Sequence, residues 1–394
     1  MTTPIQAIIN PALLVWARSS AGFELDVAAK KMSVPTSKLI AAERGDAHLT
    51  VKQLIKAAAV YKRPFAAFYL QQPPVENDIA THDYRRTSGA RALPLSSSLR
   101  FALRNARLRR RDAAFLAEEL GESPIEFNLS TTLSNDSIET AKKLREWLSV
   151  SDEDQLKWRG PRNALKSWKR RLEERNILIF ETSGIAIQEM RGFSIFASIF
   201  PTIVLNGSDS PAGRIFTLMH ELTHLALNQD GLCDTSENES PISLDDRVEV
   251  FCNRVAGEAV APASLLDSVL PSNIAPNGWT HEILLSAAIR LSTSREVILR
   301  RLLALGRTTQ AHYRRLRQEF QAEYDEQREK RKATEGGPSY YVIHYRNLGM
   351  PFVKLVFDAY SQEKISLSSV SDYLGVKLNN LEEFYSHVQS ESAL

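Results

Sequence analysis

The chain has 394 residues, of which 43% are hydrophobic and 24% are charged, a composition that excludes a disordered or collagen-like protein. At roughly 150 residues per domain, this length predicts two to four domains. Lysine and arginine number 49 against 47 aspartates and glutamates, which gives a formal net charge of +2 and excludes a uniformly basic nucleic-acid coat.

The cysteines and the apolar segments bear on the compartment. Cys233 and Cys252 are too few for a Cys-only zinc site or for the disulfide framework of a secreted protein, which favours a reducing cytosol. The first residues carry no basic segment followed by an apolar one, so no signal peptide is expected. The apolar stretch 195–205 is too short to span a bilayer. We therefore expect a cytoplasmic protein without a membrane segment.

Residues 11–70 predict five short helices, the second and third of which are joined by a sharp turn at 34–37. Two short helices joined in this way within a five-helix unit are typical of a helix-turn-helix. The third helix would begin near Thr36 and expose Ser37 and Lys38, the residues that would contact DNA. Docking of another protein, or dimerisation, is the alternative use of such a unit. The five expected helices cover 11–20, 26–32, 38–44, 51–61 and 64–69.

The proline pair in residues 71–74 ends this first domain, and residues 75–160 are predicted to form a helical connector. A helix over 100–119 places Arg100, Arg104, Arg107 and Arg111 on one face. This arginine stripe is suited to contact phosphates, and Arg104, Arg107 and Arg111 are candidates for binding single-stranded DNA. A solvated helical face is the alternative reading.

The pattern changes near residue 176, where short apolar segments predict strands over 177–180, 192–196 and 202–205. A long helix over 211–227, a polar loop over 228–243 and a helix over 244–260 follow. The strand at 202–205 lies just before the long helix and is a candidate for binding an extended peptide. Further helices are expected over 138–150, 163–175, 283–291, 294–305, 310–331, 351–360, 368–374 and 380–388, with a linker over 333–339.

The strongest motif is the sequence His-Glu-Leu-Thr-His at 220–224, which lies in the middle of the long helix. His220 and His224 are one helical turn apart, so that both imidazoles can reach one Zn²⁺ at about 2.0–2.1 Å. Glu221 suits the general base that deprotonates a water molecule at the metal. The next helix offers a third ligand in Glu249 or Glu258. These two lie nine residues apart, about half a turn out of phase, so only one can face the metal.

The segments 214–225, 249–256 and 260–262 resemble the ImmA/IrrE family of metallopeptidases, which implies that Glu249 is the third metal ligand. The N-terminal helices are similar to the Cro/C1-repressor (XRE) type of helix-turn-helix that precedes many long members. Segments 83–85, 155–180 and 349–383 also look like parts of those long members. Nearly the whole chain is covered, but only the metal motif is highly specific.

The resemblance implies a site-specific zinc endopeptidase that cleaves an XRE-type repressor, often after DNA damage, and thereby releases a set of genes. Two histidines and a glutamate also bind manganese. Glu221 would activate the water and then protonate the leaving amine, whereas His312 and Tyr313 are only candidates for stabilising the oxyanion. The alternative is a non-enzymatic XRE-type DNA-binding regulator or antitoxin. The intact Glu221 favours the enzyme, because a structural site needs no general base.

The expected fold is mainly α, with a small α+β zincin-like metallopeptidase core. We expect an XRE-like domain over 1–74, the connector over 75–160, the metallopeptidase domain over 161–315, and a linker with a C-terminal helical domain over 316–394. Assembly into a dimer is compatible with these features but is not fixed by them.

Overall fold

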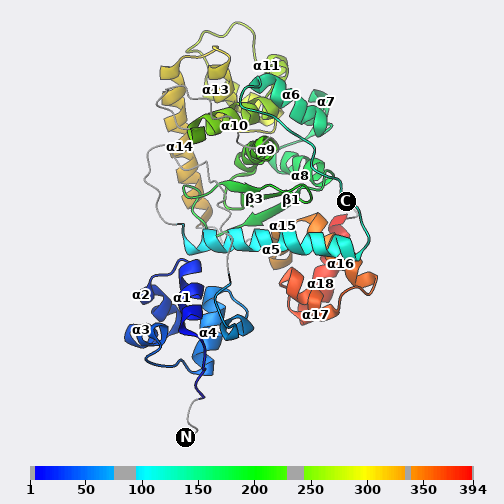
Figure 1. Cartoon of the computed structure of the whole chain (residues 1–394). Helices are drawn as coiled ribbons and strands as arrows, with labels where there is room; N and C mark the ends of the chain where they lie inside the picture. The colour runs from blue at the N-terminus through cyan, green and yellow to red at the C-terminus, as the bar shows by residue number, and fades with distance from the viewer. Residues whose placement is uncertain (1–4, 75–94, 229–243, 333–338, 393–394) are drawn as a thin grey trace. The chain divides into compact units, whose positions relative to one another are not determined.

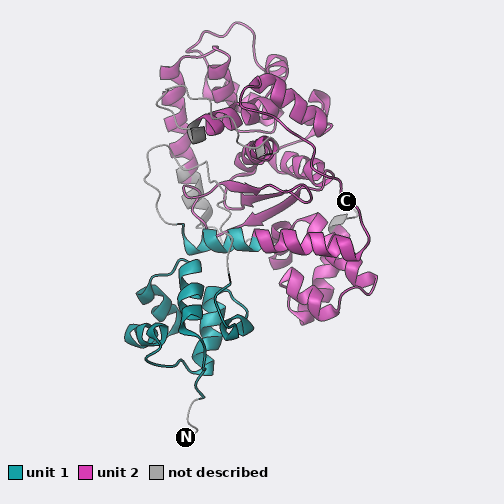
Figure 2. Ribbon diagram, viewed as in Figure 1, with its two compact units in different colours: residues 1–80, 89–105 teal, residues 81–88, 106–394 magenta. Residues whose placement is uncertain are grey.

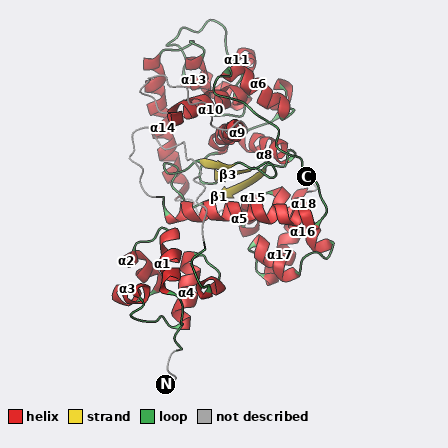
Figure 3. Ribbon diagram, viewed as in Figure 1, coloured by secondary structure: helices red, strands yellow, loops and turns green. Residues whose placement is uncertain are grey.

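The computed structural model describes residues 5–74, 95–228, 244–332 and 339–392. It consists of helices and one small sheet, which confirms the expected fold class (Figures 1 and 3). Within these ranges no helix is long and apolar enough to cross a membrane. Cys233, the segment 83–85, residues 229–243 of the expected loop and residues 333–338 of the expected linker lie outside the described residues.

The chain divides into two compact units, which Figure 2 colours separately. Unit 1 comprises residues 1–80 and 89–105, and unit 2 comprises residues 81–88 and 106–394. Helix α5 (Ser97–Glu119) begins in unit 1 and ends in unit 2. The four expected domains remain a prediction.

Unit 1 is a bundle of short helices around one apolar core, to which Leu14, Leu39 and Leu54 contribute. Two of its helices begin at side-chain capping bonds: Asn10 accepts from the Ala12 amide at the start of α1, and Thr50 forms a capping box at the start of α4. The elements of unit 1 before α5 are α1 (Pro11–Ser20), α2 (Leu25–Met32), α3 (Thr36–Arg44), α4 (Val51–Tyr61) and the 3₁₀ helix η1 (Phe65–Tyr69).

A largely buried ion pair holds α1 to α3. The Arg18 guanidinium donates to both carboxylate oxygens of Glu43, at 2.7 and 2.9 Å, and to the backbone carbonyl of Phe23 at 2.9 Å. The bidentate geometry fixes the orientation of both side chains. It therefore sets how α3, the third helix of the predicted helix-turn-helix, lies within unit 1.

Unit 2 contains the sheet and most of the helices. Four of its helices, α7, α11, α15 and η2, were not predicted from the sequence. Its elements after α5 are α6 (Ser137–Trp147), α7 (Asp152–Lys157), α8 (Pro161–Glu173), β1 (Leu178–Thr182), β2 (Gly192–Ile195), β3 (Thr202–Asn206), α9 (Pro211–Asn228), α10 (Leu244–Val260), α11 (Ala263–Val269), α12 (His281–Arg290), α13 (Arg295–Ala304), α14 (Gln310–Lys332), α15 (Tyr340–Leu348), α16 (Met350–Ser361), α17 (Leu367–Leu374), η2 (Leu378–Asn380) and α18 (Leu381–Ser392).

The sheet has the strand order β1-β3-β2, with β1 parallel and β2 antiparallel to β3. Strand β3 is therefore the central strand, and both of its edges are already hydrogen-bonded. The expectation that 202–205 binds an extended peptide is wrong for this reason. Among the strands of the described chain, β2 is an edge strand that pairs only with β3.

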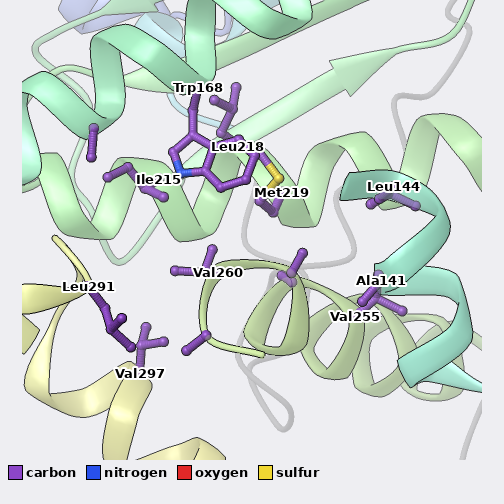
Figure 4. Close-up of a cluster of buried hydrophobic side chains, with 14 of the residues drawn as sticks. Ala141, Leu144, Trp168, Ile215, Leu218, Met219, Val255, Val260, Leu291 and Val297 are labelled. Atoms are coloured by element: carbon purple, nitrogen blue, oxygen red, sulfur yellow. The ribbon is translucent and has the colours of Figure 1, made fainter. Parts of the chain in front are cut away.

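Helices α8 and α9 lie on one face of the sheet, and that face joins the large hydrophobic core of unit 2 (Figure 1). Figure 4 shows the centre of this core, where the buried Trp168 of α8 lies near Leu218 and Met219 of α9. The same cluster contains Ala141 and Leu144 of α6. Part of the segment expected as a connector thus shares its core with the helices that follow the sheet.

The carboxyl end of α10 is held by side chains from three other helices. Arg145 of α6 donates to the Ala259 carbonyl at 2.8 Å, and Gln155 of α7 donates to the Val260 carbonyl at 2.7 Å. Arg301 of α13 donates to the next carbonyl, that of Ala261, at 3.1 Å. The last carbonyls of a helix have no partner within it, so these bonds satisfy groups that burial would otherwise leave unpaired.

Residues 339–392 form the end of unit 2, and α15 lies against the edge strand β1. The buried Glu181 of β1 meets three cations: Arg214 at 2.6 Å, Arg346 of α15 at 2.9 Å and Lys169 at 3.3 Å. Directly after α15, Gly349 approaches β1 so closely that a Cβ there would come within 2.5 Å of the Ile179 carbonyl oxygen. A side chain at position 349 would therefore disturb the contact between α15 and the sheet.

The buried ion pair between Arg301 and Glu258 gives a first prediction. Both side chains are less than 10% exposed, and burial lowers the pKa of Arg301 to about 10. Arg301→Met leaves the Glu258 carboxylate buried without its cation, so we expect the free energy of unfolding to fall by about 3 kcal/mol. Urea unfolding followed by tryptophan fluorescence measures this value. The double variant with Glu258→Met is expected to recover part of the loss, and an equal loss in both variants would contradict the explanation.

Candidate metal centre

The two histidines of the motif lie on a buried face of helix α9. Ser210 caps its start by accepting a bond from the Gly213 amide at 3.0 Å, and Pro211 occupies the first turn. His220 is fully buried and His224 is 7% exposed. Their Nε2 atoms are 3.0 Å apart, so the one-turn spacing brings both imidazoles to one point, as the sequence predicts.

Helix α10 brings a carboxylate to the same point. The Glu249 side chain is 16% exposed, and its Oε1 lies 3.2 Å from the His224 Nε2 atom. Its Oε2 lies 3.5 Å from the Nε2 atom of His220. The neighbouring residues Val248, Phe251 and Cys252 are buried and fix the rotation of α10 about its axis.

The three donor atoms fit a metal ion. They are the only group of at least three histidine, cysteine, aspartate or glutamate donors within 4.8 Å of one another in the part of the chain that the structure describes. A tetrahedral ion with ligands at about 2.0–2.2 Å needs neighbouring donor atoms about 3.3–3.5 Å apart. The two Nε2 atoms are 3.0 Å apart, and the two Glu249 oxygens lie 3.2 and 3.5 Å from them, so small side-chain adjustments would bring the donors to this spacing. Two imidazoles and one carboxylate would hold such an ion and leave a position open for water or substrate.

Glu258, the other candidate ligand, lies elsewhere. Its carboxylate pairs with Arg301 and accepts a bond from the Ala263 amide at 3.3 Å, at the start of α11. This arrangement agrees with the half-turn that separates positions 249 and 258 on one helix. The structure thus gives Glu258 a role in joining α10, α11 and α13.

Glu221 lies between the two histidines in the sequence of α9 and is 4% exposed. Its Oε2 accepts a hydrogen bond from the Ser194 hydroxyl of β2 at 3.0 Å. Sequence reasoning missed Ser194, because a serine within a short strand carries no signal of what it faces. The alternation of side chains along β2 could have indicated that Gly192 and Ser194 share one face.

His312 and Tyr313, the two candidates for stabilising the oxyanion, make contacts that hold the fold together. His312 places Nε2 3.0 Å from the Trp279 carbonyl oxygen, and Tyr313 belongs to the large hydrophobic core. Both side chains therefore help to join α14 to the rest of unit 2. Neither side chain is a member of the group formed by His220, His224 and Glu249.

The predicted DNA-binding residues of unit 1 lie at the start of α3. Ser37 is exposed and Lys38 is half-buried, whereas Leu39 on the same helix is part of the core. The start of α3 is therefore a surface from which side chains can reach a partner.

The arginine stripe of α5 is divided by its contacts. Arg104 donates to the carbonyls of Tyr61 and Lys62, at 3.1 and 2.6 Å, and thereby caps the end of α4. Arg107 is half-buried, and Arg111 is exposed. The Arg104 guanidinium must leave the end of α4 before it can neutralise a phosphate.

Comparison with known proteins supports the site. Residues 172–303 match the family model of the IrrE N-terminal-like domain, Peptidase_M78. This segment contains the whole sheet and both helices that carry the metal-binding group. The match supports an ImmA/IrrE-type family and a metallopeptidase-type function. A search of curated proteins found no match to the chain.

Removal of the carboxylate ligand is the direct test of the metal site. Glu249→Gln keeps the shape of the side chain but loses its charge, so we expect the dissociation constant for Zn²⁺ to rise by more than about 100-fold. Competition with a chromophoric chelator measures this constant. Glu296→Gln on α13 is the control, because it neutralises a partly exposed glutamate outside the metal-binding group. An unchanged affinity in Glu249→Gln would exclude this residue as a ligand.

Proposed function

We propose that the chain is a zinc-dependent, site-specific endopeptidase. The observation that supports this most is the convergence of His220, His224 and Glu249 beside an intact Glu221. A structural metal site is closed by four protein ligands, whereas three ligands and a carboxylate that is not a ligand are typical of hydrolytic sites. The match of residues 172–303 to a metallopeptidase family points in the same direction.

The residues divide the work of peptide hydrolysis. A bound zinc ion would supply a Lewis acid that polarises the scissile carbonyl and acidifies water. His220, His224 and Glu249 would hold that ion. Glu221 takes the proton from the attacking water and delivers it to the leaving amine, so that the amide bond breaks with no net change in the protonation of the carboxylate.

The edge strand β2 supports a peptide as the substrate. Among the described strands it pairs with β3 alone, and Ser194 of this strand touches Glu221. An extended peptide that added itself to β2 would run beside the catalytic carboxylate. We take an XRE-type repressor as the substrate, as the resemblance to the ImmA/IrrE family implies, and genes that respond to DNA damage or stress as the target of regulation.

The test is an intact-mass assay with Glu221→Gln. The chain is incubated with XRE-type repressors of its own genome, with Zn²⁺ or Mn²⁺, in the presence and absence of single-stranded DNA. We expect a single cut by the unchanged chain and a rate at least about 100-fold lower for Glu221→Gln, because a positioned general base contributes about that factor or more. Glu296→Gln should cut normally. Absence of any cut while the metal is bound would favour the non-enzymatic regulator.

For unit 1 we propose binding of duplex DNA through the start of α3. The support is that Ser37 and Lys38 project from a helix that the Arg18–Glu43 pair fixes within the unit. Residues at the beginning of a recognition helix are those that reach base edges. The same surface would serve to dock the repressor if DNA is not its ligand.

The DNA proposal predicts unequal effects of two lysine substitutions. Lys38→Ala should weaken binding to a duplex selected from a random pool by about tenfold or more, as loss of a specific contact does. Lys30→Ala removes the same charge from the exposed last turn of α2 and should cost much less. Fluorescence anisotropy measures both. Equal effects would indicate charge attraction alone, and no binding by the unchanged chain would favour the docking role.

A further inference from the structure

Strand β2 approaches the metal-binding helix α9 more closely than an ordinary strand could. Gly192 lies against α9, and a Cβ at this position would come within 2.4 Å of the Thr217 Cγ2 atom and 3.5 Å of the Glu221 Cγ atom. The first distance is below any that packed side chains adopt. Glycine at position 192 is therefore what allows the strand and the helix to lie this close together.

The close approach brings a short side chain within reach of Glu221. Residues 192 and 194 face the same side of the sheet, because side chains alternate along a strand. Ser194, two residues after Gly192, donates its hydroxyl hydrogen to Glu221 Oε2 at 3.0 Å. A serine hydroxyl extends only one bond beyond Cβ, so this hydrogen bond depends on the small separation that Gly192 permits.

We propose that Ser194 is a positioning residue that orients the Glu221 carboxylate, and that Gly192 sets the spacing this contact requires. This inference rests on the proposed function, in which Glu221 is the general base. A carboxylate on a long side chain loses several rotamers when it is held in one orientation. The hydroxyl of Ser194 comes from the sheet and not from α9 itself, so it restrains Glu221 relative to the strand along which a peptide would lie.

A substrate-independent probe tests the proposal on the full chain. Acetohydroxamate binds a catalytic metal and gives its proton to the neighbouring carboxylate, so its affinity depends on how that carboxylate is oriented. The chain is loaded with Co²⁺, whose visible absorption reports changes in ligation, and titrated with acetohydroxamate. The affinity for Co²⁺ itself is measured in parallel by chelator competition.

Ser194→Ala should weaken acetohydroxamate binding by about tenfold or more, roughly the effect of losing one hydrogen bond to a charged group, with unchanged Co²⁺ affinity. Ser194→Thr keeps the hydroxyl and should bind nearly as well as the unchanged chain. Gly192→Ala should weaken binding at least as much as Ser194→Ala, since the added methyl forces the strand away. Ser371→Ala is the matched control: it removes a half-buried hydroxyl that donates to the Val376 carbonyl.

The outcomes distinguish the role of Ser194 from the proposed function on which it rests. Normal acetohydroxamate affinity in Ser194→Ala, together with weakened affinity in Glu221→Gln, would overturn the role of Ser194 and leave the proposed function intact. A Ser194→Thr variant as weak as Ser194→Ala would also overturn it, because the hydroxyl would then not be the cause. Normal affinity in Glu221→Gln, or failure of the unchanged chain to bind Co²⁺, would overturn both proposals.

Discussion

The packing of α10 against α9 is the contact on which the candidate metal centre depends. The geometry of one helix is enough to bring His220 and His224 together. The third donor comes from a different helix, and its oxygens lie within 3.5 Å of both imidazoles. A rotation of α10 by one residue would turn Glu249 about 100° away from them. The buried face of α10 and the bonds at its carboxyl end exclude such a rotation.

Those bonds explain why residues far from the motif contribute to the site. Arg145, Gln155 and Arg301 reach three successive carbonyls at the end of α10. Burial lowers the pKa of Arg145, yet the charged form is kept by Asp152, which binds it at 2.8 Å. Such groups are costly to bury and costly to remove, so they fix one arrangement of α6, α7, α10 and α13. The position of Glu249 beside the two histidines depends on that arrangement.

The sequence was sufficient for the features that local periodicity encodes. The spacing of apolar residues located α9 and α10, and the one-turn spacing of histidines located the metal motif. The half-turn between positions 249 and 258 showed that only one glutamate could be a ligand, and resemblance to a family selected Glu249. Helices as short as α7 and α11 gave too few turns for a periodic pattern to be recognised.

Strand order and the contacts of single polar residues could not be predicted, because they depend on segments distant in the sequence. The three short apolar segments carry no information on which of them is central, so the sequence alone does not show that 202–205 lies between β1 and β2. Likewise, Ser194 and Glu221 are 27 residues apart in the sequence. Their contact requires β2 to lie close to α9, which the missing side chain of Gly192 allows. Periodicity places Arg104 in the arginine stripe, but it does not show that the guanidinium binds the carbonyls at the end of α4.

The two edges of the sheet differ: α15 lies against the β1 edge, whereas the β2 edge has no described strand beside it. At the β1 edge, Arg346 of α15 binds the buried Glu181, and Gly349 brings the backbone against the Ile179 carbonyl. An unpaired strand edge invites association with other strands, and a helix lying against it opposes this. At the β2 edge, no described strand completes the pairing, and this is the edge whose Ser194 touches Glu221. The C-terminal helices thus lie against the β1 edge, and a peptide strand added at the β2 edge would lie beside the helix that carries His220 and His224.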